Sequence, residues 1–370
     1  MADDLLHSPL HDRHVALGAR LAPFAGWEMP LQYTGVVEEH TAVRERVGLF
    51  DVSHLGTLDV HGRGAAAVVD RVMTNDLARI GSGQAQYTLC CTEQGGVVDD
   101  LIVYLESPQR LRLVPNAANA AAVAERLRSA APPGVHVEDH HQDVAVLAVQ
   151  GPASAAVVSA VGLPVSMGYM SFARARRAGV DVTVCRTGYT GELGYELLVP
   201  ATAAGELWDA LMQAGDEAGI QPCGLASRDT LRTEMGYPLH GQDLSVDITP
   251  VQARLRWAVG WDKHDFTGKE ALAAERAAGP ARVLRGLLAE DRSIPRPGMA
   301  VRRTGPDVGT PADAGVVTSG TFSPTLRIGI GLALLDAAVQ DGDEVNVDVR
   351  GRPGRFVVTK PPFVQASPAS

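Results

Sequence analysis

The chain has 370 residues, of which 45% are hydrophobic and 21% are charged, and this balance predicts a folded protein and excludes a disordered one. At this length we expect two or three domains. The formal net charge of −10 argues against a nucleic-acid-binding protein, which would need a basic face.

The sequence also lacks the signals of a membrane or secreted protein. No apolar run reaches the ~20 residues of a membrane helix, and the first residues carry neither the basic nor the apolar region of a signal peptide. The four cysteines have neither the paired spacing of a zinc site nor the pattern of a disulfide framework. We therefore expect a protein of the reducing cytoplasm that binds neither membranes nor nucleic acid.

Hydrophobic periodicity predicts the elements of the first half of the chain. Charged residues alternate with apolar ones at helical spacing over residues 36–46, which favours a surface helix. Another helix is predicted to begin at Asn116 or Asn119, because either side chain is a good N-terminal cap. The other predicted elements are helices over residues 65–73 and 154–161 and strands over residues 57–60 and 144–149.

Residues 86–104 predict a β-hairpin, since two apolar, β-prone runs flank a turn at residues 93–96. Asp99 and Asp100 follow this turn. In an extended strand their side chains point to opposite faces, so one of them should face a pocket. Apolar neighbours would raise the pKa of that carboxyl and suit it to proton transfer near neutral pH. Taken alone, however, the segment favours a solvated turn followed by an edge strand.

The second half of the chain begins with strands and capped helices. Strands are predicted over residues 180–186 and 197–199, and three glycines between them permit a tight backbone. Thr202 is predicted to cap a helix over residues 203–219, and Thr267 to form a capping box with Glu270 for a helix over residues 269–278. After Gly279 the chain consists of short β-prone runs between turns, which predicts a domain boundary and an antiparallel barrel or sandwich.

The chain has no dinucleotide-binding, phosphate-loop, zinc-protease or nucleophile-elbow motif, and we predict no metal site. Polar residues gather instead in a few places, and each of them alone has a structural explanation such as a cap or a turn contact. Together they predict a pocket that offers acceptors, an arginine and aromatic faces to a flat heterocycle with an anionic tail. These residues are Tyr87, Asp99, Asp100, Asn116, Tyr189, Glu192, Glu196, Arg228, Asp229 and Tyr237.

Several motifs, in order along the chain, resemble those of the T-protein of the glycine cleavage system. They include Gly-Gly-Val-Val-Asp-Asp at residues 95–100 and Thr-Gly-Tyr-Thr-Gly-Glu at residues 187–192. The other matching motifs lie at residues 24–30, 48–56, 116–119, 224–234 and 318–325. The resemblance covers the chain from about residue 11 to residue 364.

The resemblance implies an α+β fold, in which mixed α/β folate-binding domains and a small C-terminal antiparallel β-barrel form a three-domain cloverleaf. The implied domains are a discontinuous first folate-binding domain at residues 1–51 and 144–250, an inserted second domain at residues 52–143, a connecting helical segment at residues 251–279 and the barrel at residues 280–370.

The implied activity is that of a tetrahydrofolate-dependent aminomethyltransferase whose partner is the lipoylated H-protein and whose co-substrate is tetrahydrofolate. Its products would be 5,10-methylenetetrahydrofolate, ammonia and dihydrolipoyl H-protein. Carried over by motif, Asp100 matches the catalytic carboxylate of the family. Five further residues match positions that line the folate site, with Glu196 suited to the pterin ring and Arg228 to the tail. The five are Tyr87, Asn116, Tyr189, Glu196 and Arg228.

A few positions depart from the family pattern. Gln252 and Ala253 stand where many members have Glu and Gly, Leu55 stands where Met is common, and Ser227 replaces the usual Ala. None of these changes removes an acid, the arginine or a tyrosine of the predicted pocket.

Two alternatives on the same fold are a stand-alone folate-dependent demethylase module and a non-catalytic folate-binding paralogue. The absence of a dinucleotide fingerprint disfavours the first, because such modules usually follow a flavin domain. The intact pair of Asp99 and Asp100 disfavours the second.

Overall fold

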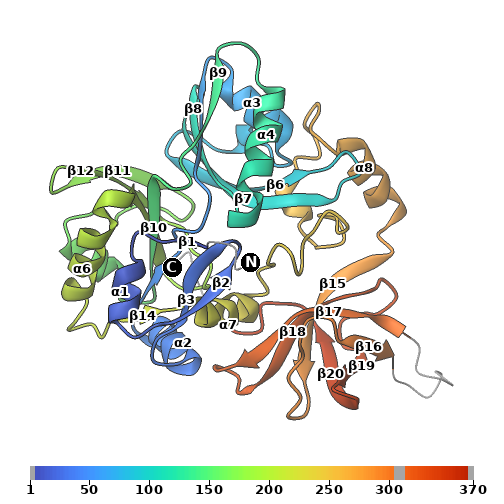
Figure 1. Cartoon of the computed structure of the whole chain (residues 1–370). Coiled ribbons are helices and arrows are strands. Elements are labelled where there is room, and N and C mark those ends of the chain that lie inside the picture. Colours follow the sequence, from blue (N-terminus) through green and yellow to red (C-terminus); the bar gives the residue numbers. More distant parts are fainter. Residues whose placement is uncertain (1–4, 304–312, 366–370) are drawn as a thin grey trace. The chain divides into compact units, whose positions relative to one another are not determined.

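The structure, a computed structural model, describes residues 5–303 and 313–365. It divides into two compact units (Figure 1). The first unit holds Met1–Thr88, Asp100–Asp229 and Ala366–Ser370, and the second holds Leu89–Asp99 and Thr230–Gln365. The outer ends of the predicted first and last domains, at residues 1–4 and 366–370, lie outside the described residues, as does the segment 304–312 of the predicted barrel domain.

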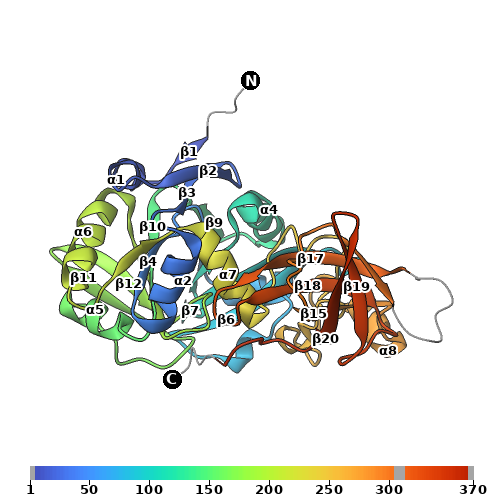
Figure 2. The same ribbon diagram turned by 90° about the horizontal axis from the view of Figure 1, so that it is seen from below.

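The largest sheet of the first unit has six strands in the order β11-β12-β13-β10-β4-β14. Alternate apolar residues of β10 and β13 form a core with α5 (Ser154–Ala160) and α6 (Ala204–Ala214), which lie beside this sheet in Figure 2. Tyr195, Leu197 and Val199 belong to this core, so Glu196 lies on the opposite face. The strands are β4 (Gly48–Asp51), β10 (Val144–Gln150), β11 (Phe172–Arg177), β12 (Val180–Cys185), β13 (Gly194–Pro200) and β14 (Gln221–Cys223).

A three-stranded sheet in the order β1-β3-β2 also belongs to the first unit. Strand β1 pairs in parallel with β3, and β2 pairs antiparallel with β3. Helix α2, which follows this sheet along the chain, is not simply a surface helix as predicted, because Glu39 is fully buried. The Glu39 carboxylate accepts hydrogen bonds from the backbone N–H groups of Tyr33 and Gly224. The elements are β1 (Leu6–His7), α1 (His11–Ala16), β2 (Arg20–Phe24), β3 (Trp27–Gln32) and α2 (Val36–Glu45).

A five-stranded sheet in the order β6-β7-β8-β5-β9 contains the predicted hairpin. Strands β6 (Gln84–Cys91) and β7 (Val97–Ser107) form its two arms, and its outer part, Leu89–Asp99, is assigned to the second unit. Helices α3 and α4 pack together beside β5, β8 and β9 (Figure 1). These elements are β5 (Leu58–Gly62), α3 (Ala65–Val72), β8 (Arg110–Val114), α4 (Ala120–Ala130) and β9 (Val135–Asp139).

The second unit contains a closed barrel in the order β15-β18-β17-β16-β19-β20, in which every pairing is antiparallel. The barrel core is apolar and includes the fully buried Phe356. Its strands are β15 (Arg282–Ala289), β16 (Ala300–Arg303), β17 (Asp313–Ser323), β18 (Ile328–Asp336), β19 (Glu344–Val349) and β20 (Arg352–Thr359). The predicted α+β fold class with a C-terminal antiparallel barrel is therefore confirmed.

Two further α-helices and several short 3₁₀ helices occur in the described part of the chain. Helix α7 (Leu225–Met235) begins in the first unit and ends in the second, and α8 (Lys269–Ala278) lies in the second. The 3₁₀ helices are Leu77–Arg79, Ala117–Asn119, Ala201–Ala203 and Arg256–Ala258. None of the helices in residues 5–303 and 313–365 is both long and apolar enough to cross a membrane.

The predicted caps are wrong, although the helices they were meant to begin are present. Helix α6 follows Ala203 with no side-chain cap, so Thr202 does not cap it. Helix α8 follows Gly268, whose left-handed backbone at φ 88° replaces the capping box expected from Thr267. Neither Asn116 nor Asn119 makes a side-chain cap. The amide Nδ2 of Asn116 donates to Asp100 instead, so this side chain is directed at β7 and its oxygen accepts no hydrogen bond as a cap.

Candidate functional site

The catalytic and folate-site residues expected from the resemblance all belong to the first unit. They form two groups, one around Asp100 and one around Glu196 and Arg228. Asp99 and Tyr237, which the sequence also singled out, belong to the second unit.

The carboxylate of Asp100 is held from two directions. The hydroxyl of Tyr87, on β6, donates to Asp100 Oδ2 over 2.9 Å. The amide Nδ2 of Asn116, just before the 3₁₀ turn, donates to Asp100 Oδ1 and to the Asp100 carbonyl oxygen, each over 3.0 Å. Two donors from different elements fix the orientation of this carboxylate. Such fixed orientation is what a proton-transferring group requires.

Asp99 and Asp100 have different surroundings, as the strand geometry requires. Both lie on β7, where successive side chains point to opposite faces. Asp99 is fully buried, whereas Asp100 is partly exposed. Of the two carboxylates, Asp100 is therefore the one that a ligand entering from solvent can reach.

Glu196 is the centre of the second group. It lies in the middle of β13, on the sheet face away from α5 and α6, and its Oε2 accepts a hydrogen bond from Thr187 Oγ1 over 2.6 Å. Thr187 Oγ1 lies 3.3 Å from the hydroxyl of Tyr104. Tyr104 shares a face of β7 with Asp100, four residues or about 13 Å along the strand. One strand thus connects the two groups.

The glycine-rich segment between β12 and β13 is folded around Gln150. This side chain is fully buried; it donates to the carbonyl oxygens of Thr187 and Tyr195 and accepts a hydrogen bond from Thr190. A Cβ on Gly188 would lie closer than 3.0 Å to Gln150. Close packing therefore favours glycine at this position. The hydrogen bond from Gln150 fixes the backbone of Thr187, whose hydroxyl donates to Glu196.

Arg228 and Tyr189 complete the second group. The guanidinium carbon of Arg228 lies 4.9 Å from the centroid of the Tyr189 ring, within the range of a cation–π contact. Its Nη1 is buried and has no hydrogen-bond partner among the described residues. Burial lowers the pKa of Arg228, and the nearby Glu196 and Tyr189 oppose this shift. A buried guanidinium with an unused donor is suited to an anionic or carbonyl group of a ligand.

His54 is a residue that the sequence argument missed. It is 4% exposed, and its Nδ1 also lacks a hydrogen-bond partner in the described part of the chain. Burial, and then the charge of Arg228, lowers the pKa of His54 to about 3. The imidazole is therefore neutral and near Arg228, where it offers a second unpaired polar atom. The sequence signal that could have identified His54 is its position in the motif at residues 48–56.

Other residues singled out in the sequence have structural roles. Glu192 pairs with Arg44 over 2.9 Å, which fastens the loop that carries Tyr189. Tyr237 belongs to the second unit, where its carbonyl oxygen accepts a hydrogen bond from Arg232.

Two segments of the chain match known protein families. Residues 10–263 match the family described as the GCVT N-terminal domain, and residues 282–365 match the glycine cleavage T-protein C-terminal barrel domain. A protein of Frankia alni named aminomethyltransferase is 62% identical over 367 residues, which is 99% of each chain. An aminomethyltransferase of Mycobacterium tuberculosis is 59% identical over 363 residues, 98% of this chain and 97% of the relative.

A solved structure agrees with these matches. The aminomethyltransferase T of the glycine cleavage system from Bartonella henselae superposes with a TM-score of 0.91 at 34% identity, covering 98% of this chain and 99% of that one. The fold, the site and the relatives define an enzyme of the aminomethyltransferase class. The chain belongs to the glycine cleavage T-protein family.

Proposed function

We propose that this aminomethyltransferase transfers the methylene carbon of an aminomethyl group, carried on the lipoyl arm of H-protein, to tetrahydrofolate. The products are 5,10-methylenetetrahydrofolate, ammonia and dihydrolipoyl H-protein. The observation that carries the proposal is the carboxylate of Asp100, held by Tyr87 and Asn116 on a partly exposed strand face.

The proton balance of this reaction explains why an oriented carboxylate is useful. The methylene carbon exchanges its bonds to sulfur and to the amino nitrogen for bonds to N5 and N10 of the folate. N5 and N10 each lose a proton, while the sulfur and the departing ammonia each gain one. A single group that accepts a proton from a folate nitrogen and returns it to a leaving atom can serve both the proton-loss and the proton-gain steps. We assign this role to Asp100, with Tyr87 and Asn116 as positioning residues.

The second group of residues fits the remaining parts of a folate. Glu196 offers a carboxylate acceptor, and Tyr189 offers an aromatic face. Arg228 Nη1 and His54 Nδ1 are buried atoms that find no hydrogen-bond partner within residues 5–303 and 313–365. Leaving such groups unpaired costs free energy that a bound polar ligand recovers. We therefore propose that Glu196 binds the pterin ring and that Arg228 faces the negatively charged tail.

We further propose the partner, domain boundaries and compartment that go with this activity. Lipoylated H-protein delivers the substrate arm. The first folate-binding domain comprises residues 1–51 and 144–250, the inserted domain residues 52–143, the connecting segment residues 251–279 and the barrel domain residues 280–370. The four cysteines are buried and form no disulfide among the described residues, which supports a reducing cytoplasm.

A coupled assay tests the proposal. The chain is mixed with lipoylated H-protein, glycine decarboxylase, glycine and tetrahydrofolate, and methylenetetrahydrofolate is measured. A parallel reaction replaces the H-protein system with sarcosine and an electron acceptor. We expect product only with H-protein. Product from sarcosine alone would favour the demethylase alternative, and folate binding without product in either reaction would favour the non-catalytic paralogue.

A further inference from the structure

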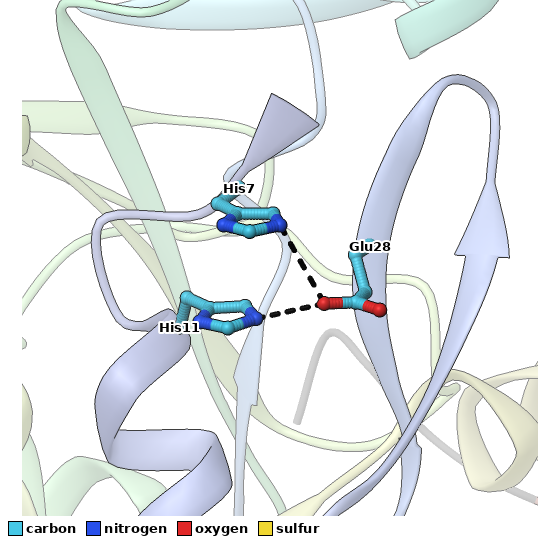
Figure 3. A group of neighbouring side chains, drawn as sticks. All are labelled: His7, His11 and Glu28. Carbon is cyan, nitrogen blue, oxygen red and sulfur yellow. Dashed lines mark hydrogen bonds and ion pairs between the residues drawn. The ribbon is translucent and has the colours of Figure 1, made fainter. Parts of the chain in front are cut away.

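A histidine–carboxylate cluster at the N-terminal sheet has no role in the proposed transfer. His7 at the end of β1, His11 at the start of α1 and Glu28 on β3 direct their side chains toward one point (Figure 3). His11 Nε2 lies 2.8 Å and His7 Nε2 lies 3.6 Å from the same oxygen, Glu28 Oε2. All three belong to the first unit.

The backbone explains why these side chains meet. Strands β1 and β3 pair in parallel with His7 directly opposite Glu28, so the two side chains share a face of the sheet. Helix α1 is anchored beside them by the fully buried Leu10 and His14. The His7 and His11 rings consequently stack with centroids 4.0 Å apart and an interplanar angle of 4°. The cluster is thus assembled by the fold before any ligand enters.

We infer that His7, His11 and Glu28 form a binding site for one divalent transition-metal ion of the zinc class. Two imidazoles and one glutamate, with further positions open to water, are a ligand set that zinc takes in proteins. The three ligand atoms lie within 4.8 Å of one another. Ligands of a tetrahedral zinc lie about 3.4 Å apart, given bond lengths of about 2.1 Å. The 3.6 Å between His7 Nε2 and Glu28 Oε2 already approaches this spacing. The 2.8 Å between His11 Nε2 and Glu28 Oε2 must lengthen, and the stacked rings must rotate so that both Nε2 lone pairs point at one ion.

The surroundings favour a cation and allow it to enter. The side chain of His7 is 54% exposed, that of Glu28 32% and that of His11 20%, so a hydrated ion can exchange its waters for these ligands. His11 Nδ1 lies 3.6 Å from Asp12 Oδ1. This carboxylate adds negative charge beside the cluster, which favours the approach of a cation. A bound ion would join β1, α1 and β3 through one centre.

Titration calorimetry of the chelator-treated full chain with ZnCl₂ tests the site. We expect the wild-type chain to bind one equivalent of zinc tightly. His7→Ala and His11→Ala should each lower the zinc affinity by more than the roughly 10- to 100-fold caused by removing a residue that only hydrogen-bonds to a metal ligand. His61→Ala is the matched control, because His61 also pairs with a glutamate, Glu138, at 3.2 Å and stacks on another histidine. This variant should retain the tight equivalent.

Spectroscopy and thermal denaturation provide a second test. Cobalt added to the wild-type chain should give visible ligand-field absorption that zinc abolishes, and zinc should raise the melting temperature of the wild-type chain but not that of the His7→Ala variant. The inference is overturned if the wild-type chain takes up no tight equivalent, if the double variant of His7 and His11 keeps it, or if His61→Ala removes it.

Discussion

Replacing Arg228 by Met should separate ligand binding from stability. The substitution removes a charged donor whose Nη1 has no partner among the described residues, while it keeps much of the side-chain length. A hydrogen bond to a charged group contributes about 1.5–3 kcal/mol, so the dissociation constant for tetrahydrofolate should rise roughly 10- to 150-fold. The free energy of unfolding of the ligand-free chain should change little, because the buried Nη1 that is removed makes no hydrogen bond among the described residues.

Titration calorimetry under anaerobic conditions measures the affinity, and urea denaturation measures the stability. Arg174→Met is the matched control, since Arg174 is an exposed arginine of the same unit that pairs with Glu106 at 2.6 Å. It should change neither quantity appreciably. An Arg228→Met chain that binds folate like the wild type would refute the assignment. A large loss of stability would instead indicate that Arg228 supports the fold.

Two further predictions concern stability. Gly188→Ala should lower the free energy of unfolding by about 1–3 kcal/mol, because the added Cβ would crowd Gln150. Gly168→Ala is the control, because a Cβ there has open space. Equal urea midpoints for the two variants would contradict this prediction. Burial raises the pKa of Asp59, but its hydrogen bonds with Arg112 outweigh this and lower the pKa below the ordinary 3.8. Asp59 should therefore stabilise the folded state above about pH 4 and lose this effect as the pH falls through its folded-state pKa. In urea denaturation at several pH values, the free energy of unfolding of Asp59→Asn should depend less on acid pH than that of the wild type. An unchanged pH dependence would contradict this role of Asp59.

The sequence predicted the elements well where the pattern is local. The apolar run at residues 144–149 and the helical spacing of residues 36–46 predicted β10 and α2 with nearly their observed ends. The capping predictions failed because a cap depends on what else competes for the side chain. Asn116 could cap a helix through its side-chain oxygen, but its Nδ2 donates to Asp100, which turns the side chain toward β7.

The site was predictable only in part, because some of its contacts join residues that are far apart in the sequence. The alternation along β7 identified Asp100 as one of two candidates, and the same alternation could have identified Tyr104 on its face. The contact of Tyr104 with Thr187 joins residues 83 positions apart in sequence. No local pattern contains such a contact. The burial of Gln150, which shapes the glycine-rich segment, likewise becomes visible only once β10 and β13 are paired.

The most direct test of the account is the rate of methylenetetrahydrofolate formation by Asp100→Asn in a single turnover with aminomethylated H-protein. The variant keeps the shape of the side chain but cannot accept a proton, so the rate should fall about 10²- to 10⁴-fold while tetrahydrofolate still binds. Asp209→Asn changes an exposed carboxylate of the same unit and should react at the wild-type rate. A wild-type rate for Asp100→Asn would contradict the central claim that this carboxylate moves the protons of the reaction.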